Sequence, residues 1–361
     1  MDILGVGIVG CGGIANAKHI PNLLKDPRVE IRGICEGYDM ERAKATVKQF
    51  DLHACKLYDK LEKLLQDETI SIIHVCTPNG THAEISIKAL EAGKHVMCEK
   101  PMATSVKDAI AMGQACTRSG KKLTICSNNR FREDSWVLKQ ICSDNVLGDI
   151  YYAKATYLRR RGVPTWGSFL NKEIQGGGPV IDIGTHSLDL ALWMMDNYEP
   201  KSVYAATYNF LGKQTSEANP YGNWKSEDFT TEDFGVGLIT MKNGATILLE
   251  ASWLLNIKED KNAQVTLCGT KAGSDMENGL KIYSEQYGKL CNQELLLNPQ
   301  GINFYKPTSA YGPELEIRSW IDAIINDNDP IVKPSQMITV MEIIQAFYTS
   351  AERGQPVLIG E

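Results

Sequence analysis

The stretch from Ile3 to Ala15, with the sequence ILGVGIVGCGGIA, decides the fold. Its first part, Ile3–Val9, is an uncharged run rich in β-branched residues and is typical of a buried strand. The remainder, Gly10–Ala15, has the pattern G-x-G-x-x-A and precedes a helical pattern. Strand, glycine-rich turn and helix in this order predict the first unit of a dinucleotide-binding fold, although a purely structural turn is the alternative.

Each small residue of this turn has a physical reason to be there. Gly10 permits the tight turn, and Gly12 lets the backbone approach a pyrophosphate closely. Gly13 and Ile14 follow where the first amides of the helix would face the phosphates, and Ala15 keeps the helix close to the strand. We therefore expect these five residues to bind the cofactor.

The first 126 residues alternate strand-like and helical patterns. The expected strands are Ile3–Val9, Val29–Cys35, Ile70–Cys76, His95–Cys98 and Leu123–Cys126. The expected helices are Ala15–Lys25, Met40–Phe50, Thr81–Ala92 and Ser105–Ser119. This alternation predicts a doubly wound α/β domain, residues 1–127, with a parallel sheet covered on both faces.

The rest of the chain, residues 128–361, has a different pattern. A helix near Trp136–Cys142 is followed by the expected strands Ile150–Tyr157, Val203–Phe210, Thr231–Met241, Ala245–Leu254 and Gln264–Leu267. Helices are expected at Val180–Met195, Pro313–Asn326 and Ser335–Glu352, and Asn243-Gly244 predicts a hairpin turn. We therefore expect a second α/β domain with a large, mostly antiparallel open sheet.

The second strand ends at Glu36, 26 residues after Gly10. A carboxylate at this position can accept hydrogen bonds from the adenosine ribose and repels a ribose 2′-phosphate, so NAD is favoured over NADP. Arg42 could accommodate that phosphate, although an arginine on a helix surface is the simpler interpretation.

The next two parallel strands end in polar segments, and ligands bind beyond the carboxyl ends of such strands. These segments contain Thr77, Pro78, Asn79 and His82, and then Glu99, Lys100 and Pro101. We expect Asn79 and Lys100 to face the cofactor, and Thr77, Pro78, His82 and Glu99 to take part in binding it. For a lone lysine after a strand, a solvated surface position is the alternative.

Residues Gly176–Asp189 combine a glycine run with an unusually apolar helix. At about 100° per residue, Asp182, His186 and Asp189 fall on one face of that helix. Three interpretations stay open: a buried hydrogen-bonded network, a catalytic site, or, as the third option, a metal site.

Composition excludes several classes of function. With 38 basic and 44 acidic side chains, the net charge of −6 gives no electrostatic basis for nucleic-acid binding. No stretch reaches the roughly 18 apolar residues of a membrane span, and Ile3–Ala15 lacks the preceding basic residues of a signal peptide. Ten cysteines without a C-x-x-C pair indicate small core residues in a reducing compartment, so we expect a cytoplasmic protein.

A polar stretch, Gly212–Asp233, carries Tyr221, Trp224 and Phe229 between two expected strands. A loop of this length in a compact domain is often functional. It is either a surface insertion or a segment that contacts substrate or another subunit.

The motifs together resemble the Gfo/Idh/MocA oxidoreductases. The resemblance rests on the glycine-rich turn, Thr77-Pro78-Asn79 with His82, Glu99-Lys100-Pro101, Asn128-Asn129-Arg130-Phe131, the run Arg160–Trp166 and the run Gly176–Asp189. It implies an N-terminal Rossmann domain and a C-terminal domain whose open sheet carries substrate on one face and often subunit contacts on the other. A dimer or tetramer formed through that sheet is therefore expected.

The resemblance also implies roles for individual residues. Lys100, Asp182 and His186 would form the catalytic set and contact substrate, and no metal would be needed. Asn128 and Trp166 would lie near the cofactor, and Trp166 would also contact substrate. An imidazole is a suitable base at neutral pH, and a lysine ammonium stabilises an alkoxide, so either His186 or Lys100 could take the hydroxyl proton.

The expected activity is NAD-dependent oxidation of a secondary alcohol on a sugar, glycoside or cyclitol, with C3 of a glycoside as one target. Two alternatives are an NAD-dependent glycosidase that oxidises its sugar transiently, and a non-catalytic NAD-binding sensor.

Overall fold

The computed structural model describes residues 3–297 and 311–360, and these form two compact units. The described residues of unit 1 lie within Met1–Asn128 and Ser309–Ile338, and those of unit 2 within Asn129–Thr308 and Thr339–Glu361. The expected domains 1–127 and 128–361 also include residues 1–2, 298–310 and 361, which lie outside the described part. Residues 311–338 belong to unit 1, so this division differs from the expected one, in which a single boundary follows residue 127.

Unit 1 contains a six-stranded sheet in the order β3-β2-β1-β4-β5-β6, with every neighbouring pair parallel. Its strands are β1 (Leu4–Val9), β2 (Val29–Cys35), β3 (Lys56–Tyr58), β4 (Ile72–Val75), β5 (His95–Cys98) and β6 (Leu123–Ile125). Strand order reverses where β1 lies between β2 and β4, and ligands of open α/β sheets bind at such a switch point. The predicted doubly wound parallel sheet is confirmed.

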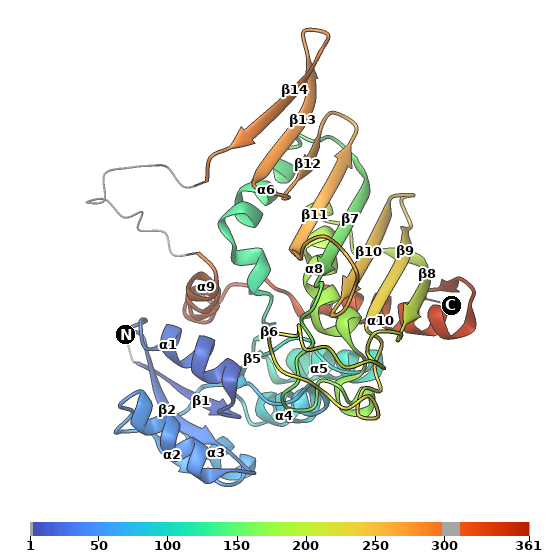
Figure 1. Cartoon of the computed structure of the whole chain (residues 1–361). Coiled ribbons are helices and arrows are strands. Elements are labelled where there is room, and N and C mark those ends of the chain that lie inside the picture. Colours follow the sequence, from blue (N-terminus) through green and yellow to red (C-terminus); the bar gives the residue numbers. More distant parts are fainter. Residues whose placement is uncertain (1–2, 298–310, 361) are drawn as a thin grey trace. The chain divides into compact units, whose positions relative to one another are not determined.

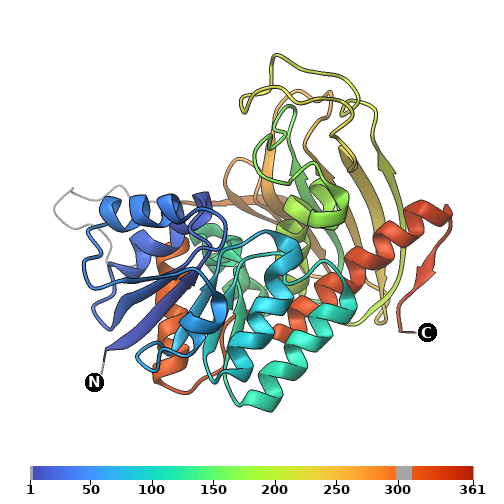
Figure 2. The same ribbon diagram turned by 90° about the horizontal axis from the view of Figure 1, so that it is seen from below.

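The helical elements of unit 1 connect these strands. They are η1 (Ala15–His19), α1 (Ile20–Leu23), α2 (Met40–Gln49), α3 (Leu61–Leu65), η2 (Asn79–Thr81), α4 (His82–Glu91) and α5 (Val106–Ser119). Figure 2 shows α4 and α5, in cyan to teal, packed side by side. The expected helix Ala15–Lys25 is a π-helical turn continued by a short α-helix, and the pair β3 and α3 was not predicted. Strand β3 has only three residues, too few to show an alternation of apolar and polar side chains.

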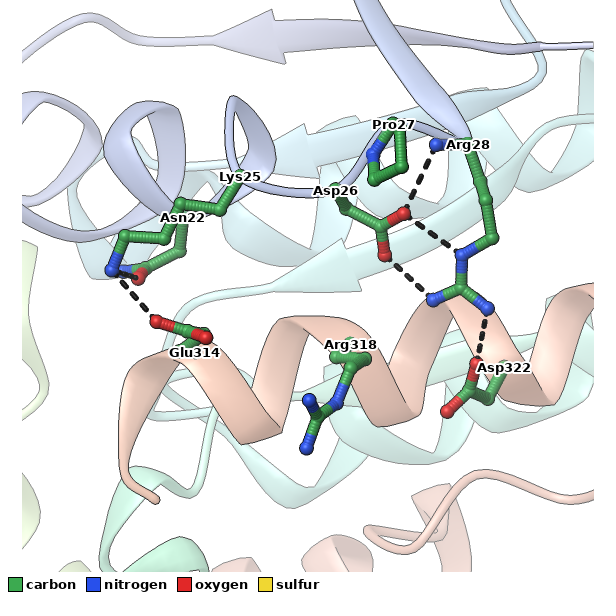
Figure 3. A pocket seen from close by; sticks show the side chains of 8 residues that line it. All are labelled: Asn22, Lys25, Asp26, Pro27, Arg28, Glu314, Arg318 and Asp322. Carbon is green, nitrogen blue, oxygen red and sulfur yellow. Dashed lines mark hydrogen bonds and ion pairs between the residues drawn. The ribbon is translucent and has the colours of Figure 1, made fainter. Parts of the chain in front are cut away.

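Helix α9 (Pro313–Ile325) is part of unit 1, although it lies far along the chain. Its Ile317, Trp320 and Ile321 are buried in the same apolar cluster as β1 and β2. At the rim, Lys25 Nζ lies 2.8 Å from Glu314 Oε2, and Arg28 bonds both Asp26 and Asp322 (Figure 3). Apolar burial and ion pairs thus explain why this helix does not belong to the second domain. No sequence pattern within the helix indicates that it packs against unit 1.

Unit 2 is built on a nine-stranded sheet in the order β14-β13-β12-β11-β7-β10-β9-β8-β15 (Figure 1). Its strands are β7 (Ile150–Leu158), β8 (Pro200–Tyr208), β9 (Phe234–Met241), β10 (Thr246–Ser252), β11 (Lys261–Gly269), β12 (Gly273–Asp275), β13 (Leu280–Gln286), β14 (Lys289–Leu295) and β15 (Val357–Leu358). All neighbouring pairs are antiparallel except β7 and β10. The mostly antiparallel sheet and the β9–β10 hairpin at Asn243-Gly244 are confirmed.

The second half of the chain also contains helical elements. They are α6 (Glu133–Ser143), α7 (Lys172–Gln175), η4 (Val180–Gly184), α8 (Thr185–Met195) and α10 (Pro334–Arg353), while η3 (Asn128–Phe131) joins the two units. On β9, added methyl groups at Gly235 and Gly237 would lie 2.3 Å from Val180 Cγ2 and 2.5 Å from Phe347 Cε2. Glycine in this strand therefore lets η4 and α10 lie directly on the sheet.

The four cysteines that end expected strands, Cys35, Cys76, Cys98 and Cys126, are free and buried, as predicted. Among residues 3–297 and 311–360, no helix is long and apolar enough to cross a bilayer.

Candidate active site

The glycine-rich loop of unit 1 has the space that a dinucleotide needs. A methyl group on Gly12 or Gly13 would meet no atom within 4 Å, whereas one on Gly10 would lie 2.8 Å from the Cys76 carbonyl oxygen. Gly10 also has φ +83°, a conformation that favours glycine. Ala15 is fully buried and Ile14 is 42% exposed, so the loop is closed toward the sheet and open on its outer side.

Glu36 lies beside this loop at the end of β2. Its Oε2 accepts a hydrogen bond from the Cys11 amide at 3.4 Å, and its Oε1 accepts one from the Tyr38 amide at 3.1 Å. The carboxylate therefore places negative charge next to the glycine-rich turn, which opposes a ribose 2′-phosphate.

The segments that follow β4 and β5 are joined by His82. Its two ring nitrogens lie 2.8 Å from the carbonyl oxygens of Pro101 and Thr77. The ring is buried, and burial lowers the pKa of His82. His82 thus connects the backbone at Thr77, after β4, with the backbone at Pro101, after β5, and both of its ring nitrogens are used. Asn79 begins η2 directly after Pro78.

Glu99 and Lys100 are adjacent, but the structure gives them different surroundings. The Glu99 carboxylate is buried, with Oε1 3.0 Å from Lys18 Nζ and 2.9 Å from His19 Nε2. Burial would raise the pKa of Glu99, but Lys18 and His19 hold it well below its usual range. Its Oε2 accepts the Lys100 amide at 3.2 Å. Glu99, expected at the cofactor, therefore supports the backbone of Lys100, whose own side chain is half-buried after a cis Lys100–Pro101 peptide.

In unit 2, the expected helix Val180–Met195 is divided into the π-helical η4 and the α-helix α8. Every residue from Val180 to Met194 is buried except His186. π-Helical turns are rare and occur frequently at functional sites. The turn thus precedes the one accessible side chain of an otherwise enclosed segment.

Asp182 lies in the π-helical turn and is held by a tryptophan. The Trp253 indole Nε1 donates to Asp182 Oδ2 at 3.0 Å, and Trp253 is fully buried. The His186 ring lies 6.3 Å from the Tyr157 ring, and the Arg159 guanidinium carbon lies 5.4 Å from the Tyr157 ring centre. Burial works against the charge of Arg159, but Tyr157 and Asp182 outweigh it and raise its pKa.

Asp189, on the same predicted face, has a different role. Its carboxylate is buried and accepts two hydrogen bonds from Arg130, at 2.9 Å from Nε and 2.5 Å from Nη2. Arg130 is fully buried, and Tyr198 and Trp193 also contact its guanidinium. The network interpretation therefore holds for Asp189, a carboxylate already neutralised within the core.

Trp166 is 53% exposed and belongs to an aromatic group in unit 2. Its ring lies 5.0 Å from Tyr221 and 5.8 Å from Phe169, edge to face in both cases. Tyr221 comes from the segment Gly212–Asp233, and Phe229 of that segment packs 6.3 Å from Trp253. The segment has no helix or strand, but it contacts both Trp166 and the tryptophan that holds Asp182.

Among the described residues, one group of potential metal ligands has all its donor atoms within 4.8 Å, namely His19, Glu99 and Cys126. Lys18 supplies a positive charge 3.0 Å from Glu99 Oε1 in this group. Neither Asp182 nor His186 belongs to it.

Two family models match the chain. Residues 4–127 match the oxidoreductase family with an NAD-binding Rossmann fold, and residues 136–274 match the GFO/IDH/MocA C-terminal domain. The chain belongs to the GFO/IDH/MocA family of oxidoreductases.

Individual relatives agree with this family. The chain is 32% identical over 354 residues to D-glucoside 3-dehydrogenase of Escherichia coli, covering 97% of this chain and 96% of the relative. It is 26% identical over 368 residues to glucose-6-phosphate 3-dehydrogenase of Bacillus subtilis, with 98% of both chains covered. A solved structure of levoglucosan dehydrogenase in complex with NADH superposes with a TM-score of 0.85, at 22% identity and full coverage of both chains.

The predicted family, fold and enzyme class are therefore confirmed: this GFO/IDH/MocA protein is an oxidoreductase with an NAD-binding Rossmann fold. The open space at Gly12 and Gly13 and the carboxylate of Glu36 fit that cofactor.

Several residues of this region were not predicted as part of the site. Tyr157, Arg159 and Trp253 surround Asp182 and His186, and all three lie at the ends of strands β7 and β10. The available signal was their position, since the carboxyl ends of two neighbouring parallel strands share one edge of the sheet. That parallel pairing was not apparent in a region that otherwise indicated antiparallel strands.

Proposed function

We propose that this protein oxidises a secondary hydroxyl on a sugar ring, with C3 of a glycoside as the target. The observation that carries the proposal is the accessible His186 beside Tyr157, one turn after an Asp182 held by Trp253, together with the aromatic group around Trp166. Polar groups suit vicinal hydroxyls, and aromatic faces suit the apolar face of a sugar ring. The names of two relatives specify oxidation at C3.

In the proposed mechanism, bound NAD supplies the hydride acceptor. The residues of the glycine-rich turn would hold the cofactor, together with Glu36, Thr77, Pro78, Asn79, Asn128 and Trp166. The His186 imidazole takes the hydroxyl proton, and Asp182 orients the imidazole or shares hydrogen bonds with a neighbouring hydroxyl. Lys100, in the first unit, is the third member of the catalytic set on the grounds of its motif, and its ammonium stabilises the developing alkoxide.

Substitution tests these roles separately from cofactor binding. We expect His186→Ala and Lys100→Ala each to lower kcat by about 10²-fold or more. NAD affinity measured by calorimetry should stay nearly unchanged, because the Rossmann loop is intact. Near-normal turnover in either variant would remove that residue from the catalytic set, and activity that is lost to a chelator and restored by a divalent cation would revive a metal-dependent reaction.

The substrate is tested with glycosides, free sugars and cyclitols, by following NADH absorbance. A glycoside deuterated at C3 should lose its label on oxidation, whereas label lost from C1 alone would indicate a lactone and contradict the proposal. Release of free sugar without net NADH would instead indicate the glycosidase reaction.

For the partner, we propose a second copy of the chain bound through the uncovered face of the nine-stranded sheet. Side chains alternate along a strand, so residues between Gly235 and Gly237 and their cross-strand neighbours point away from η4 and α10. On this face Tyr204 is 54% exposed, its neighbour Leu238 is 42% exposed, and Tyr208 stacks on Phe234 at 5.6 Å. Leu238→Glu should shift the protein to a smaller species in analytical ultracentrifugation; an unchanged mass would place any interface elsewhere.

A cytoplasmic location remains part of the proposal, supported by the ten free cysteines.

A further inference from the structure

The beginning of η4, the turn that carries Asp182, is held by two side chains from distant parts of unit 2. Glu232 Oε2 accepts the Gly178 amide at 2.9 Å, and its Oε1 accepts the Val180 amide at 3.1 Å. Glu232 is 8% exposed and comes from the end of the Gly212–Asp233 segment. The first amides of a helix have no partner within the helix, so a buried start needs acceptors of this kind.

Tyr348, on α10, completes the arrangement. Its hydroxyl donates to Glu232 Oε1 at 2.8 Å and accepts the Ile181 amide at 3.2 Å. Because Pro179 has no amide proton, Glu232 and Tyr348 together bind every backbone donor from Gly178 to Ile181. We call these two side chains the η4 cap.

The glycines before η4 make room for this cap. A methyl group on Gly177 would lie 2.1 Å from the Tyr348 hydroxyl oxygen. One on Gly178 would lie 2.3 Å from the Glu232 carbonyl oxygen and 3.1 Å from its carboxyl carbon. Gly177 and Gly178 are therefore required by the close approach of the cap.

The cap acts on an element that has little stability of its own. A five-residue π-helical turn is an uncommon conformation, and a negative charge at its start also interacts favourably with the local backbone dipoles. Asp182 is the middle residue of this turn, and its backbone N–H donates a hydrogen bond to the Gly178 carbonyl oxygen at 3.0 Å. Where η4 starts therefore determines where Asp182 and His186 lie.

We propose that Glu232 and Tyr348 are positioning residues for Asp182 and His186. The proposal rests on the roles given to those two residues under the proposed function. Through these two residues, α10 and the end of the Gly212–Asp233 segment determine the geometry of Asp182 and His186 without contacting substrate.

The test uses Glu232→Gln and Tyr348→Phe in the full chain. A glutamine has one acceptor oxygen where the carboxylate has two, so at least one backbone amide loses its partner. We expect kcat to fall roughly tenfold in each variant, since small displacements of reacting groups are costly, while KM for NAD changes less than about twofold.

Ser350→Ala is the matched control. Ser350 lies on the same helix, accepts the Ala205 amide at 3.0 Å and donates to the Gln355 carbonyl at 2.8 Å, and contacts neither Glu232 nor η4 in these bonds. It should lower the melting temperature about as much as Tyr348→Phe does and leave kcat within about twofold. Loss of kcat in the control to the same extent would reduce the cap to general stability.

A second measurement does not depend on substrate. The chain has six histidines, so the His186 imidazole resonance can be assigned in isotope-labelled protein by its disappearance in His186→Gln. We expect this resonance to move in Glu232→Gln and Tyr348→Phe and to stay in Ser350→Ala. An unmoved resonance in both cap variants would overturn the proposal. Full activity of His186→Ala would instead refute the proposed catalytic role while leaving this structural test valid.

Discussion

Asp182 and Asp189 show how far a single residue can be interpreted from its spacing. Both are carboxylates on the same predicted face of one helix, and both are almost fully buried. Asp189 is neutralised by Arg130, 59 residues away in sequence, whereas Asp182 accepts the neutral indole of Trp253. Spacing predicts that such carboxylates need partners but not which partner each has.

The bond from Trp253 to Asp182 gives the first prediction. Trp253→Phe keeps an aromatic ring against Phe229 but removes the Nε1 hydrogen bond to Asp182 Oδ2. We expect kcat to fall roughly tenfold and stability to fall by about 1–2 kcal/mol. The measurements are steady-state kinetics and urea unfolding.

Trp320→Phe is the control for this change. Trp320 is equally buried, and its Nε1 has no hydrogen-bond partner in the described part of the chain. The same replacement there removes no hydrogen bond, so kcat should stay unchanged. Equal kcat for Trp253→Phe and the original protein would mean that Asp182 does not depend on the indole.

At the scale of elements, the glycine-rich turn combines two different requirements. Gly10 is needed by the fold, because a side chain would collide with the Cys76 carbonyl and strain a backbone at φ +83°. A side chain at Gly12 would instead enter empty space, where we expect the pyrophosphate to bind. Substitution of Gly10 should therefore affect stability, whereas substitution of Gly12 should affect cofactor binding.

We expect Gly12→Val to fold normally and to lose NAD binding by at least about tenfold, since its side chain occupies the space of the pyrophosphate. Gly10→Val should instead lower the melting temperature strongly. Calorimetric titration of NAD and a thermal melt of each variant separate the two effects. Unchanged NAD affinity in Gly12→Val would place the cofactor elsewhere.

Elements with strong local signals could be predicted, and those defined by distant contacts could not. Val29–Cys35 and His95–Cys98 were predicted to the residue, because each is a short, largely apolar run between two helical patterns. Strands β13 and β14 were missed: β14 is largely exposed on both faces, so burial imposes no alternation on it. In the site, the motifs indicated His186 and Lys100, whereas Glu232 and Tyr348 act through backbone bonds that leave no local pattern.

For the whole molecule, titratable groups are distributed unequally between the two units. Three histidines of unit 1, His74, His82 and His95, have pKa values lowered mainly by burial, and for His95 the pKa falls to about 4. In unit 2, burial instead raises the pKa values of Glu232 and Asp233. The two units should therefore respond to acid in opposite directions.

The sign follows from which state binds more protons. A histidine buried in its neutral form binds a proton less readily when folded than when unfolded, so its effect on stability is absent above about pH 6.5 and becomes unfavourable as the pH falls toward 4. At pH 5.5 the pKa shifts of these histidines therefore destabilise unit 1 relative to pH 7.5. Glu232 and Asp233 favour the folded state as they become protonated, so unit 2 loses nothing through them on acidification.

We therefore expect unit 1 to melt first, and earlier, when the pH is lowered from 7.5 to 5.5. Differential scanning calorimetry at several pH values measures this, and added NAD identifies the transition of unit 1 by raising its temperature. His95→Gln should reduce the pH dependence of that transition, because glutamine cannot be protonated. The pH dependence of the later transition, which belongs to unit 2, should stay unchanged. If the NAD-sensitive transition has the same temperature at pH 7.5 and 5.5, the buried histidines do not limit the stability of unit 1.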